Sequence, residues 1–126
     1  MAQDDLVIDP WGSAQSTDYD RIIDQFGLTS MERVELRSPS KLHRRGIVFA
    51  HRDVDQVLEA QRTGNDFGVL TGLMPSGQMH LGHSMVVEQA RWFQQQGGDV
   101  TIAVADLESQ ATRGVSLSKG RSIALE

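Results

Sequence analysis

The sequence predicts an α/β fold in which helices flank a parallel sheet, preceded by a short helical extension at the N-terminus. From Gly46 onward, short apolar runs typical of strands alternate with longer amphipathic segments typical of helices. This order indicates a parallel sheet with right-handed crossovers. The run at 100–105 (VTIAVA) is apolar without alternation, as in a strand buried on both faces of such a sheet. We therefore expect residues 1–40 to form an arm and helical extension, and residues 41–126 to form the sheet domain.

The extension is expected to contain two short helices. Residues 1–16 are polar and are interpreted as a loose arm. Thr17 is expected to cap a helix that ends at Gly27. Ser30 is expected to start a second short helix, and residues 38–40 (SPS) are typical of a linker.

Within the sheet domain the alternation predicts three strands and three helices. The strands are expected at 47–50, 67–71 and 100–105. The helices are expected at 54–64 with Asp53 as its cap, at 82–96, and after Ser116, with a polar loop before Ser116. The helix at 82–96 has the clearest pattern, because Gly97 and Gly98 stop it and its broad apolar face predicts core residues: Met85, Val86, Ala90, Trp92 and Phe93.

Composition excludes several classes of protein. The chain has 126 residues, enough for one domain or less. It contains no cysteine, which excludes a disulfide framework and a zinc–thiolate site. No apolar run is long enough to span a membrane, and the N-terminus is acidic where a signal peptide would be basic, so we expect a cytoplasmic location. A net charge of −5 argues against broad electrostatic binding to nucleic acid. Local contact stays open through a basic cluster made of Lys41, His43, Arg44 and Arg45.

The candidate functional site is the stretch 75–83 (PSGQMHLGH). His80 and His83 are three residues apart and so share a helix face. They fall at a helix N-terminus, where unpaired backbone N–H groups and the helix dipole favour an anion. Gly82 leaves the backbone bare for a flat ligand, so this chemistry indicates a nucleotide site. The alternative is a metal site, which would need a third ligand from His43, His51 or a carboxylate.

These residues resemble a known signature. PSGQMHLGH is similar to the "HIGH" motif of class I aminoacyl-tRNA synthetases. Three further segments narrow the resemblance to the archaeal and eukaryotic type of tryptophanyl-tRNA synthetase: HRRGIVFAHRD at 43–53, TGLMPSG at 71–77 and ADLE at 105–108. The resemblance implies the first half of a Rossmann-like (HUP-type) sheet, hence the N-terminal portion of a synthetase.

The resemblance also implies a reaction. The carboxylate of tryptophan attacks the α-phosphorus of ATP, which arrives with Mg²⁺, and the tryptophanyl group of the resulting adenylate then moves to tRNA(Trp). On this reading His80 and His83 contact the triphosphate and are the catalytic residues. ATP binding further involves Gly82 and a loop shaped by Pro75, Ser76 and Gly77.

The implied amino-acid pocket contains Leu70, Thr71, Gly72 and Glu108. Leu70 stands where tyrosyl and human-like tryptophanyl enzymes have a tyrosine, which favours an apolar side chain such as indole over a phenol. Glu108 matches a carboxylate near the amino acid, able to engage the indole N–H or the ammonium group. Ala103 replaces a polar residue of the human-like form, so the pocket departs from that pattern.

The family's KMSKS loop and second half have no counterpart in these residues. Ser116–Gly120 (SLSKG) comes directly after the last strand and is interpreted as a helix cap with Lys119 in the first turn. For the full-length form we expect tRNA(Trp) and tryptophan as partners and a homodimer. Two alternatives stay open: another nucleotidyltransferase of the H-x-G-H superfamily, and a non-catalytic nucleotide-binding paralogue or partner subunit.

Overall fold

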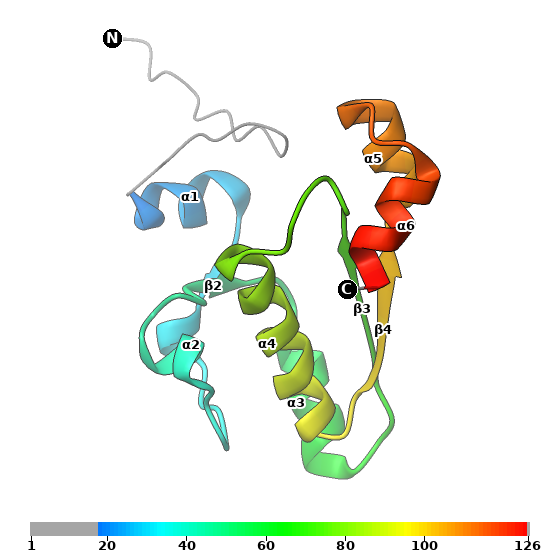
Figure 1. Cartoon of the computed structure of the whole chain (residues 1–126). Coiled ribbons are helices and arrows are strands. Elements are labelled where there is room, and N and C mark those ends of the chain that lie inside the picture. Colours follow the sequence, from blue (N-terminus) through cyan, green and yellow to red (C-terminus); the bar gives the residue numbers. More distant parts are fainter. Residues whose placement is uncertain (1–17, 126) are drawn as a thin grey trace, which may run out of the picture. The chain divides into compact units, whose positions relative to one another are not determined.

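The computed structural model describes residues 18–125, which divide into two compact units at 18–55 and 56–125 (Figure 1). No helix within these residues is both long and apolar enough to cross a membrane. The elements of the first unit are α1 (Tyr19–Phe26), β1 (Thr29–Ser30), the 3-10 helix η1 (Met31–Arg33), α2 (Lys41–Arg44) and β2 (Ala50–His51). α3 (Val54–Thr63) runs across the boundary. The second unit continues with β3 (Gly68–Leu73), α4 (Leu81–Gln95), β4 (Asp99–Val104), α5 (Asp106–Arg113) and α6 (Leu117–Leu125).

The first helix is capped one residue later than the sequence suggests. The Asp18 carboxylate accepts from the backbone N–H of Arg21 at 3.0 Å, so Asp18 is the N-cap of α1. Thr17, the expected cap, lies outside the described residues. The expected stop is confirmed, because Gly27 takes the left-handed conformation that ends the helix (φ 59°). The short helix expected from Ser30 is also confirmed, since Ser30 caps η1.

The strand expected at 47–50 is wrong in position and in partner. β2 covers only Ala50–His51 and pairs antiparallel with β1, and β3 and β4 form a separate sheet. The N–H of Met31 extends this ladder by donating to the Phe49 carbonyl at 2.9 Å. A run of four apolar residues shows neither its direction nor its partner, and two polar residues in β1 carry no strand pattern. The parallel sheet therefore has two strands among the described residues, where three were expected.

The residues interpreted as a linker contain the cap of an unexpected helix. Ser40 Oγ accepts from the backbone N–H of Leu42 at 3.2 Å, and His43 Nδ1 accepts from the N–H of Ser40 at 3.2 Å. This reciprocal capping box starts α2 and buries Leu42, which is 4% exposed. The basic cluster of the sequence therefore lies on a helix.

The capping role of His43 predicts a pH-dependent stability. Burial lowers the pKa of His43 below its usual 6.5, because desolvation disfavours the charged ring. The unfolded chain then binds the proton of this histidine more tightly than the folded chain does. The contribution of neutral His43 to stability is therefore fully present above pH 6.5 and is lost as the pH falls below that value. We expect His43→Gln to lose this part of the pH dependence while keeping the cap, since Gln also serves at this position of a capping box. Denaturant unfolding of the parent chain and of His43→Gln at pH 7.5 and 5.5 measures this difference. If both proteins lost the same free energy of unfolding between the two pH values, the prediction would be contradicted.

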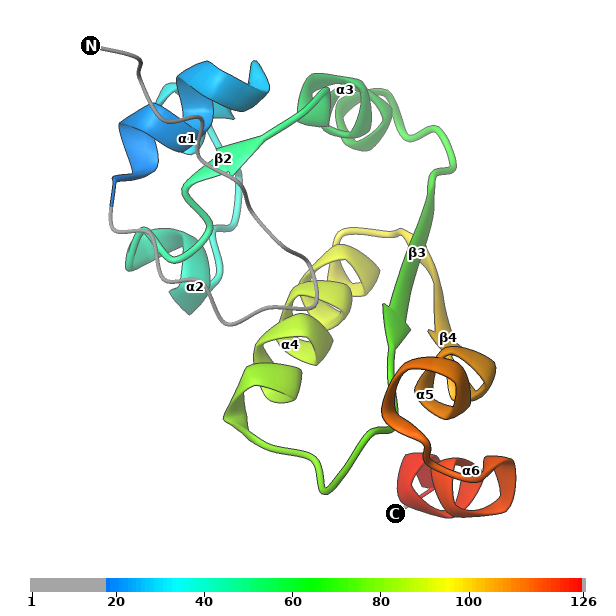
Figure 2. The ribbon, with the colours of Figure 1, turned by 90° about the horizontal axis from the view of Figure 1, so that it is seen from above.

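The second unit is built on the parallel pair β3 and β4. Their register runs from Gly68 opposite Asp99 to Leu73 opposite Val104, and α4 packs against both strands. Figures 1 and 2 both show α5 and α6 at the end of the strands where β4 stops. The crossover β3–α4–β4 predicted from the sequence is confirmed.

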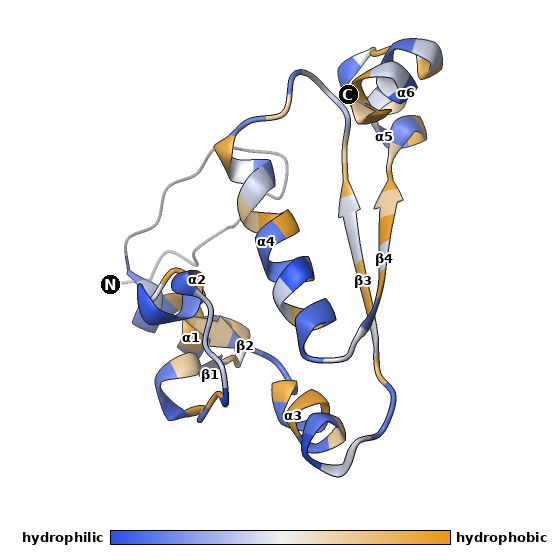
Figure 3. Cartoon of the chain, turned by 60° about the horizontal axis from the view of Figure 1, so that its bottom comes forward, coloured by the Kyte–Doolittle hydropathy of each residue, from blue (hydrophilic) through white to orange (hydrophobic). Residues whose placement is uncertain are grey.

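β4 is not buried on both faces as its continuous apolar run suggests. Ile102 is 42% and Val104 45% exposed, and Figure 3 shows apolar residues along the strand. On β3, Leu70 is 76% exposed. A sheet with two strands leaves an open edge and much of a face uncovered, so a sequence suited to full burial remains largely exposed in the part of the chain described here.

The helix expected at 82–96 is confirmed as α4, which begins at Leu81 and ends at Gln95. Of the predicted core, Ala90 and Trp92 are 5% and 6% exposed, whereas Val86 is 37% exposed. The Trp92 and Phe93 rings meet edge to face at a centroid distance of 4.8 Å. The polar loop expected before Ser116 is wrong, because β4 leads directly into α5. Ser116 caps α6 as expected, accepting from the N–H of Lys119 at 3.4 Å.

Substitution of Gly98, in the turn between α4 and β4, is expected to lower the stability of the protein. An alanine Cβ at this position would lie 2.6 Å from Phe67 Cε2 and 3.1 Å from the Phe93 carbonyl oxygen. The ring would have to move and the backbone oxygen has little room, so we expect Gly98→Ala to cost about 1–3 kcal/mol of stability, as for overpacked cores. Urea unfolding measures this cost. Gly120→Ala is the matched control, since its Cβ would meet Pro75 at an ordinary 3.5 Å.

Candidate functional site

The side chains of His80 and His83 cap the N-terminus of α4 by accepting hydrogen bonds from backbone N–H groups in its first turn. His80 Nδ1 accepts from the backbone N–H of Gly82 at 3.1 Å, and His83 Nδ1 accepts from the N–H of His80 at 3.3 Å. The two rings lie 4.0 Å apart between centroids. Each ring thus satisfies one of the N–H groups that a helix start leaves unpaired. The stretch expected to bind an anion thus ends in a doubly capped helix N-terminus.

The caps fix which nitrogen of each ring carries the proton. A ring nitrogen that accepts a hydrogen bond has no hydrogen, so each neutral ring carries its proton on Nε2. His80 is exposed and His83 half-buried. Both histidines therefore hold an Nε2–H donor that the helix cap does not use, at the positive end of the α4 dipole. Two such donors side by side suit an anionic ligand.

Gly82 is needed for this geometry. A Cβ at this position would lie 3.0 Å from Cε1 and 3.1 Å from Nδ1 of the His80 ring. Any side chain would push the ring away from the N–H that it accepts from. The sequence predicts that Gly82 leaves room for a ligand, and the cap is a second reason for a glycine at this position.

The loop between β3 and α4 is anchored by contacts with α5 and α6. Pro75 is fully buried, and its carbonyl accepts from Ser109 Oγ at 3.0 Å. Ser109 itself is 0% exposed. Gly120 of α6 brings its backbone against the Pro75 ring, and Thr112 of α5 approaches the sulfur of Met74 at 3.6 Å. These contacts anchor one end of the loop, while Ser76 and Gly77 remain exposed.

An ion pair ties α5 to α6 beside this anchor. Arg121 Nε donates to Asp106 Oδ2 at 2.9 Å, and Asp106 Oδ1 accepts from the N–H of Leu107 at 2.8 Å. The hydrogen bond from Arg121 is the main cause that lowers the pKa of Asp106, and the Leu107 N–H adds to it. Asp106 is thus charged at neutral pH and holds the two helices together at the carboxyl end of β4.

The residues expected around the amino acid divide between two faces of the sheet. Burial alternates along β3, with Leu70 and Gly72 exposed and Thr71 half-buried. Because successive side chains of a strand point to opposite faces, the Thr71 side chain lies on the other face from Leu70. Glu108 is exposed in the first turn of α5. The loop at Pro75 and the segment Asp106–Glu108 do meet at the carboxyl edge of the strands, as expected.

Sequence reasoning missed the supporting residues of this edge. Ser109, Gly120 and Arg121 belong to a polar segment whose pattern predicts no buried role. The one available signal was a glycine inside an expected helix, which often marks close packing. Within residues 18–125 no three groups come together that could hold a metal ion.

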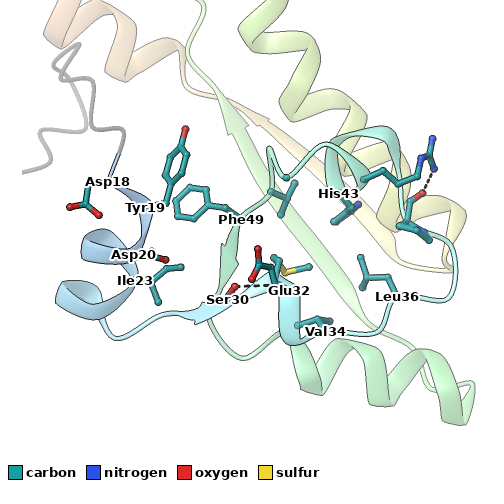
Figure 4. A pocket seen from close by; sticks show the side chains of 15 residues that line it. Asp18, Tyr19, Asp20, Ile23, Ser30, Glu32, Val34, Leu36, His43 and Phe49 are labelled. Atoms are coloured by element: carbon teal, nitrogen blue, oxygen red, sulfur yellow. Dashed lines mark hydrogen bonds between the residues drawn. The ribbon is translucent and has the colours of Figure 1, made fainter.

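A cavity of about 560 Å³ lies in the first unit, and its lining contains no residue predicted for the nucleotide or amino-acid site. Figure 4 shows Asp18, the N-cap of α1, and Asp20 at one side, His43 at the other, and the Tyr19 and Phe49 rings between them. The two rings pack at a centroid distance of 4.5 Å. Its lining mixes acidic, basic and apolar side chains and contains no triad or metal cluster, so it provides no catalytic constellation.

Comparison with known proteins supports the resemblance. The family model described as "tRNA synthetases class I (W and Y)" matches residues 61–124, which include the loop at Pro75 and the paired histidines. The tryptophan–tRNA ligase of Methanosarcina acetivorans is 44% identical over 124 residues, which are 97% of this chain and 28% of that protein. Tryptophan–tRNA ligase 1 of Halobacterium salinarum is 45% identical over 114 residues, covering 89% of this chain and 22% of that protein.

Solved structures show the same similarity. The crystal structure of tryptophanyl-tRNA synthetase from Aeropyrum pernix K1 superposes with a TM-score of 0.78 at 43% identity, covering 94% of this chain and 34% of that one. The enzyme from Encephalitozoon cuniculi, bound to tryptophan, gives a TM-score of 0.70 at 29% identity over 84% of this chain and 34% of that one. The chain thus spans about a fifth to a third of the length of these relatives. It belongs to the class I tRNA synthetases of the W and Y family.

Proposed function

We propose that the chain is the N-terminal part of the catalytic domain of a tryptophan–tRNA ligase. The full enzyme would join tryptophan to ATP, giving tryptophanyl-adenylate and pyrophosphate, and would then transfer the tryptophanyl group to tRNA(Trp). Two ring N–H donors, fixed at one helix N-terminus in a chain of the W and Y family, carry this proposal. The choice of tryptophan is supported by relatives named tryptophan–tRNA ligase at 44–45% identity.

His80 and His83 would act on the triphosphate. Their Nε2–H groups would donate to phosphate oxygens whose charge grows as the α-phosphorus becomes five-coordinate. Donors held in place before the reaction stabilise such charge without reorganising, which is the main source of catalysis in this kind of transfer. Gly82 would let the adenosine lie close to the helix, and residues 75–77 would shape the loop around it.

The tryptophan would lie near the carboxyl end of β3 with the ammonium or indole N–H close to Glu108. Leu70 would offer an apolar contact to the indole, since it is exposed on the sheet surface. Gly72 shares that face, whereas Thr71 would contribute through its backbone or from the other side of the sheet.

The remaining components would come with the substrates or the rest of the enzyme. Mg²⁺ would enter on the ATP phosphates, as is usual for an ion that keeps most of its waters and few protein ligands. We also propose a homodimer for the full-length form and a cytoplasmic location, where tRNA is charged.

The test uses a chimera in which residues 18–125 of this chain replace the matching third of the Aeropyrum pernix enzyme. The readout is amino-acid-dependent exchange of labelled pyrophosphate into ATP, with that enzyme itself as the positive control. Exchange that depends on tryptophan is the expected result. It reports adenylate formation alone, so it needs no tRNA.

Other outcomes decide against the proposal. Exchange with tyrosine instead of tryptophan would overturn the amino acid and keep the family. A chimera that folds, as judged by circular dichroism and a cooperative melt, but exchanges with no amino acid would support a non-catalytic nucleotide-binding paralogue.

A further inference from the structure

Three cations share one side of α2, here called the α2 basic face: Lys41, Arg44 and Arg45. The backbone N–H of Arg45 donates to the Lys41 carbonyl at 3.1 Å, so Arg45 continues the helical geometry. Lys41 and Arg45 are therefore one turn apart, with Arg44 beside them at i+3. All three residues are exposed, whereas Leu42 faces inward at 4% exposure.

The helix and one of its cations are held in place. The Ser40–His43 capping box fixes the start of the helix, and Arg44 Nη1 donates to the Pro39 carbonyl at 2.5 Å. Arg44 and Arg45 also lie at the C-terminal end of α2, where the helix dipole favours positive charge. A cation held in place before binding loses less side-chain entropy than a flexible one.

The charge of the α2 basic face contrasts with the rest of the chain. Residues 33–45 contain five of the twelve lysines and arginines and a single carboxylate, which gives the segment a net charge of +4. The whole chain has a net charge of −5, so the other residues sum to −9. The negative charge of the other residues would repel a polyanion, and the α2 basic face would attract it.

We propose that the α2 basic face contacts the phosphate backbone of tRNA. This inference rests on the proposed function, which supplies an RNA substrate. Guanidinium groups bind phosphate through paired N–H donors, and two of the three side chains are arginines. An overall acidic enzyme needs a local cationic surface to hold RNA, and residues 33–45 hold the densest cationic segment of this sequence.

The test is filter binding of a tryptophan tRNA transcript to the 126-residue chain at several KCl concentrations. The variant combines Lys41→Ala, Arg44→Ala and Arg45→Ala. The matched control combines Lys119→Ala, Arg62→Ala and Arg91→Ala, which removes the same residue types from exposed positions elsewhere. Each phosphate contact contributes about 0.7–0.9 to the slope of log K against log[salt]. We expect the variant to flatten this slope by about 2 and weaken binding about tenfold or more at low salt, and the control to match the parent chain.

Equal losses in variant and control would overturn the inference, because only overall charge would then matter. Absence of RNA binding by the parent chain would also overturn it and would favour an acidic protein surface as the partner. Failure of the proposed function is measured separately. In the chimera, the α2 variant should exchange pyrophosphate normally and show a raised KM for tRNA in aminoacylation. If the chimera exchanges nothing, filter binding by the chain itself still decides the RNA contact.

Discussion

Replacing His83 by alanine in the chimera is expected to lower tryptophan-dependent pyrophosphate exchange by about 10²–10³-fold, as for loss of one preorganised donor to a developing charge. His83 Nδ1 is occupied by the N–H of His80 at 3.3 Å, so its Nε2–H is the group available to a phosphate. The loss should appear in kcat, since the donor acts on charge that exists mainly in the transition state. Initial exchange rates over a range of ATP and tryptophan concentrations measure it.

The same substitution removes a helix cap, and His83→Glu separates the two roles. Glutamate at this position can accept the N–H of His80, which preserves the capping box, but its carboxylate has no N–H to donate to a phosphate. We therefore expect His83→Glu to lose exchange at least as strongly as His83→Ala. Only the alanine variant should also lose stability, by about 0.5–2 kcal/mol. A glutamate variant with normal exchange would show that His83 is a cap and not a ligand of the phosphates.

The parts of the fold that the sequence predicts well are those with long periodic patterns. Fifteen residues of α4 repeat their apolar face over four turns and meet Gly97 at the end, so its bounds come out within one residue. The edge at which Pro75 and Asp106 meet follows from topology, because the carboxyl ends of parallel strands lie together. The capping residues Ser30 and Ser116 could be read directly, because a serine ahead of an apolar pattern has a local role.

The remaining parts depend on contacts that no local pattern records. β1 and β2 have two residues each and are held by pairing between residues 20 to 22 positions apart in the sequence. α5 is polar around most of its surface and depends on the buried Ser109 for its position, so its sequence resembles a loop. α2 is one turn long, and a histidine occupies the position where a capping box usually has glutamate or glutamine. The reciprocal histidine cap of α4 was likewise not predicted, because the same two residues indicate a ligand-binding role.

Replacing Ser109 by alanine is expected to lower the free energy of unfolding by about 1–3 kcal/mol, the usual cost of leaving a buried polar group without its partner. Ser109 Oγ donates to the Pro75 carbonyl at 3.0 Å, and both residues are fully buried. Because Pro75 and Ser109 are both buried, the alanine variant would leave this carbonyl oxygen in the interior without the hydroxyl donor. Urea unfolding of the parent chain and the variant gives the difference.

Ser84→Ala is the matched control for this change. Ser84 Oγ donates to the Leu81 carbonyl at 2.7 Å, but the site is exposed, so water can replace the lost donor. We expect its substitution to change stability by no more than about 0.5 kcal/mol.

Because Pro75 begins the loop that leads to His80, the Ser109 variant in the chimera should also raise the KM for ATP. The His83→Glu variant should lower kcat at unchanged stability. If both serine variants lost the same stability, the Ser109 hydroxyl would not be the group that anchors the Pro75 loop.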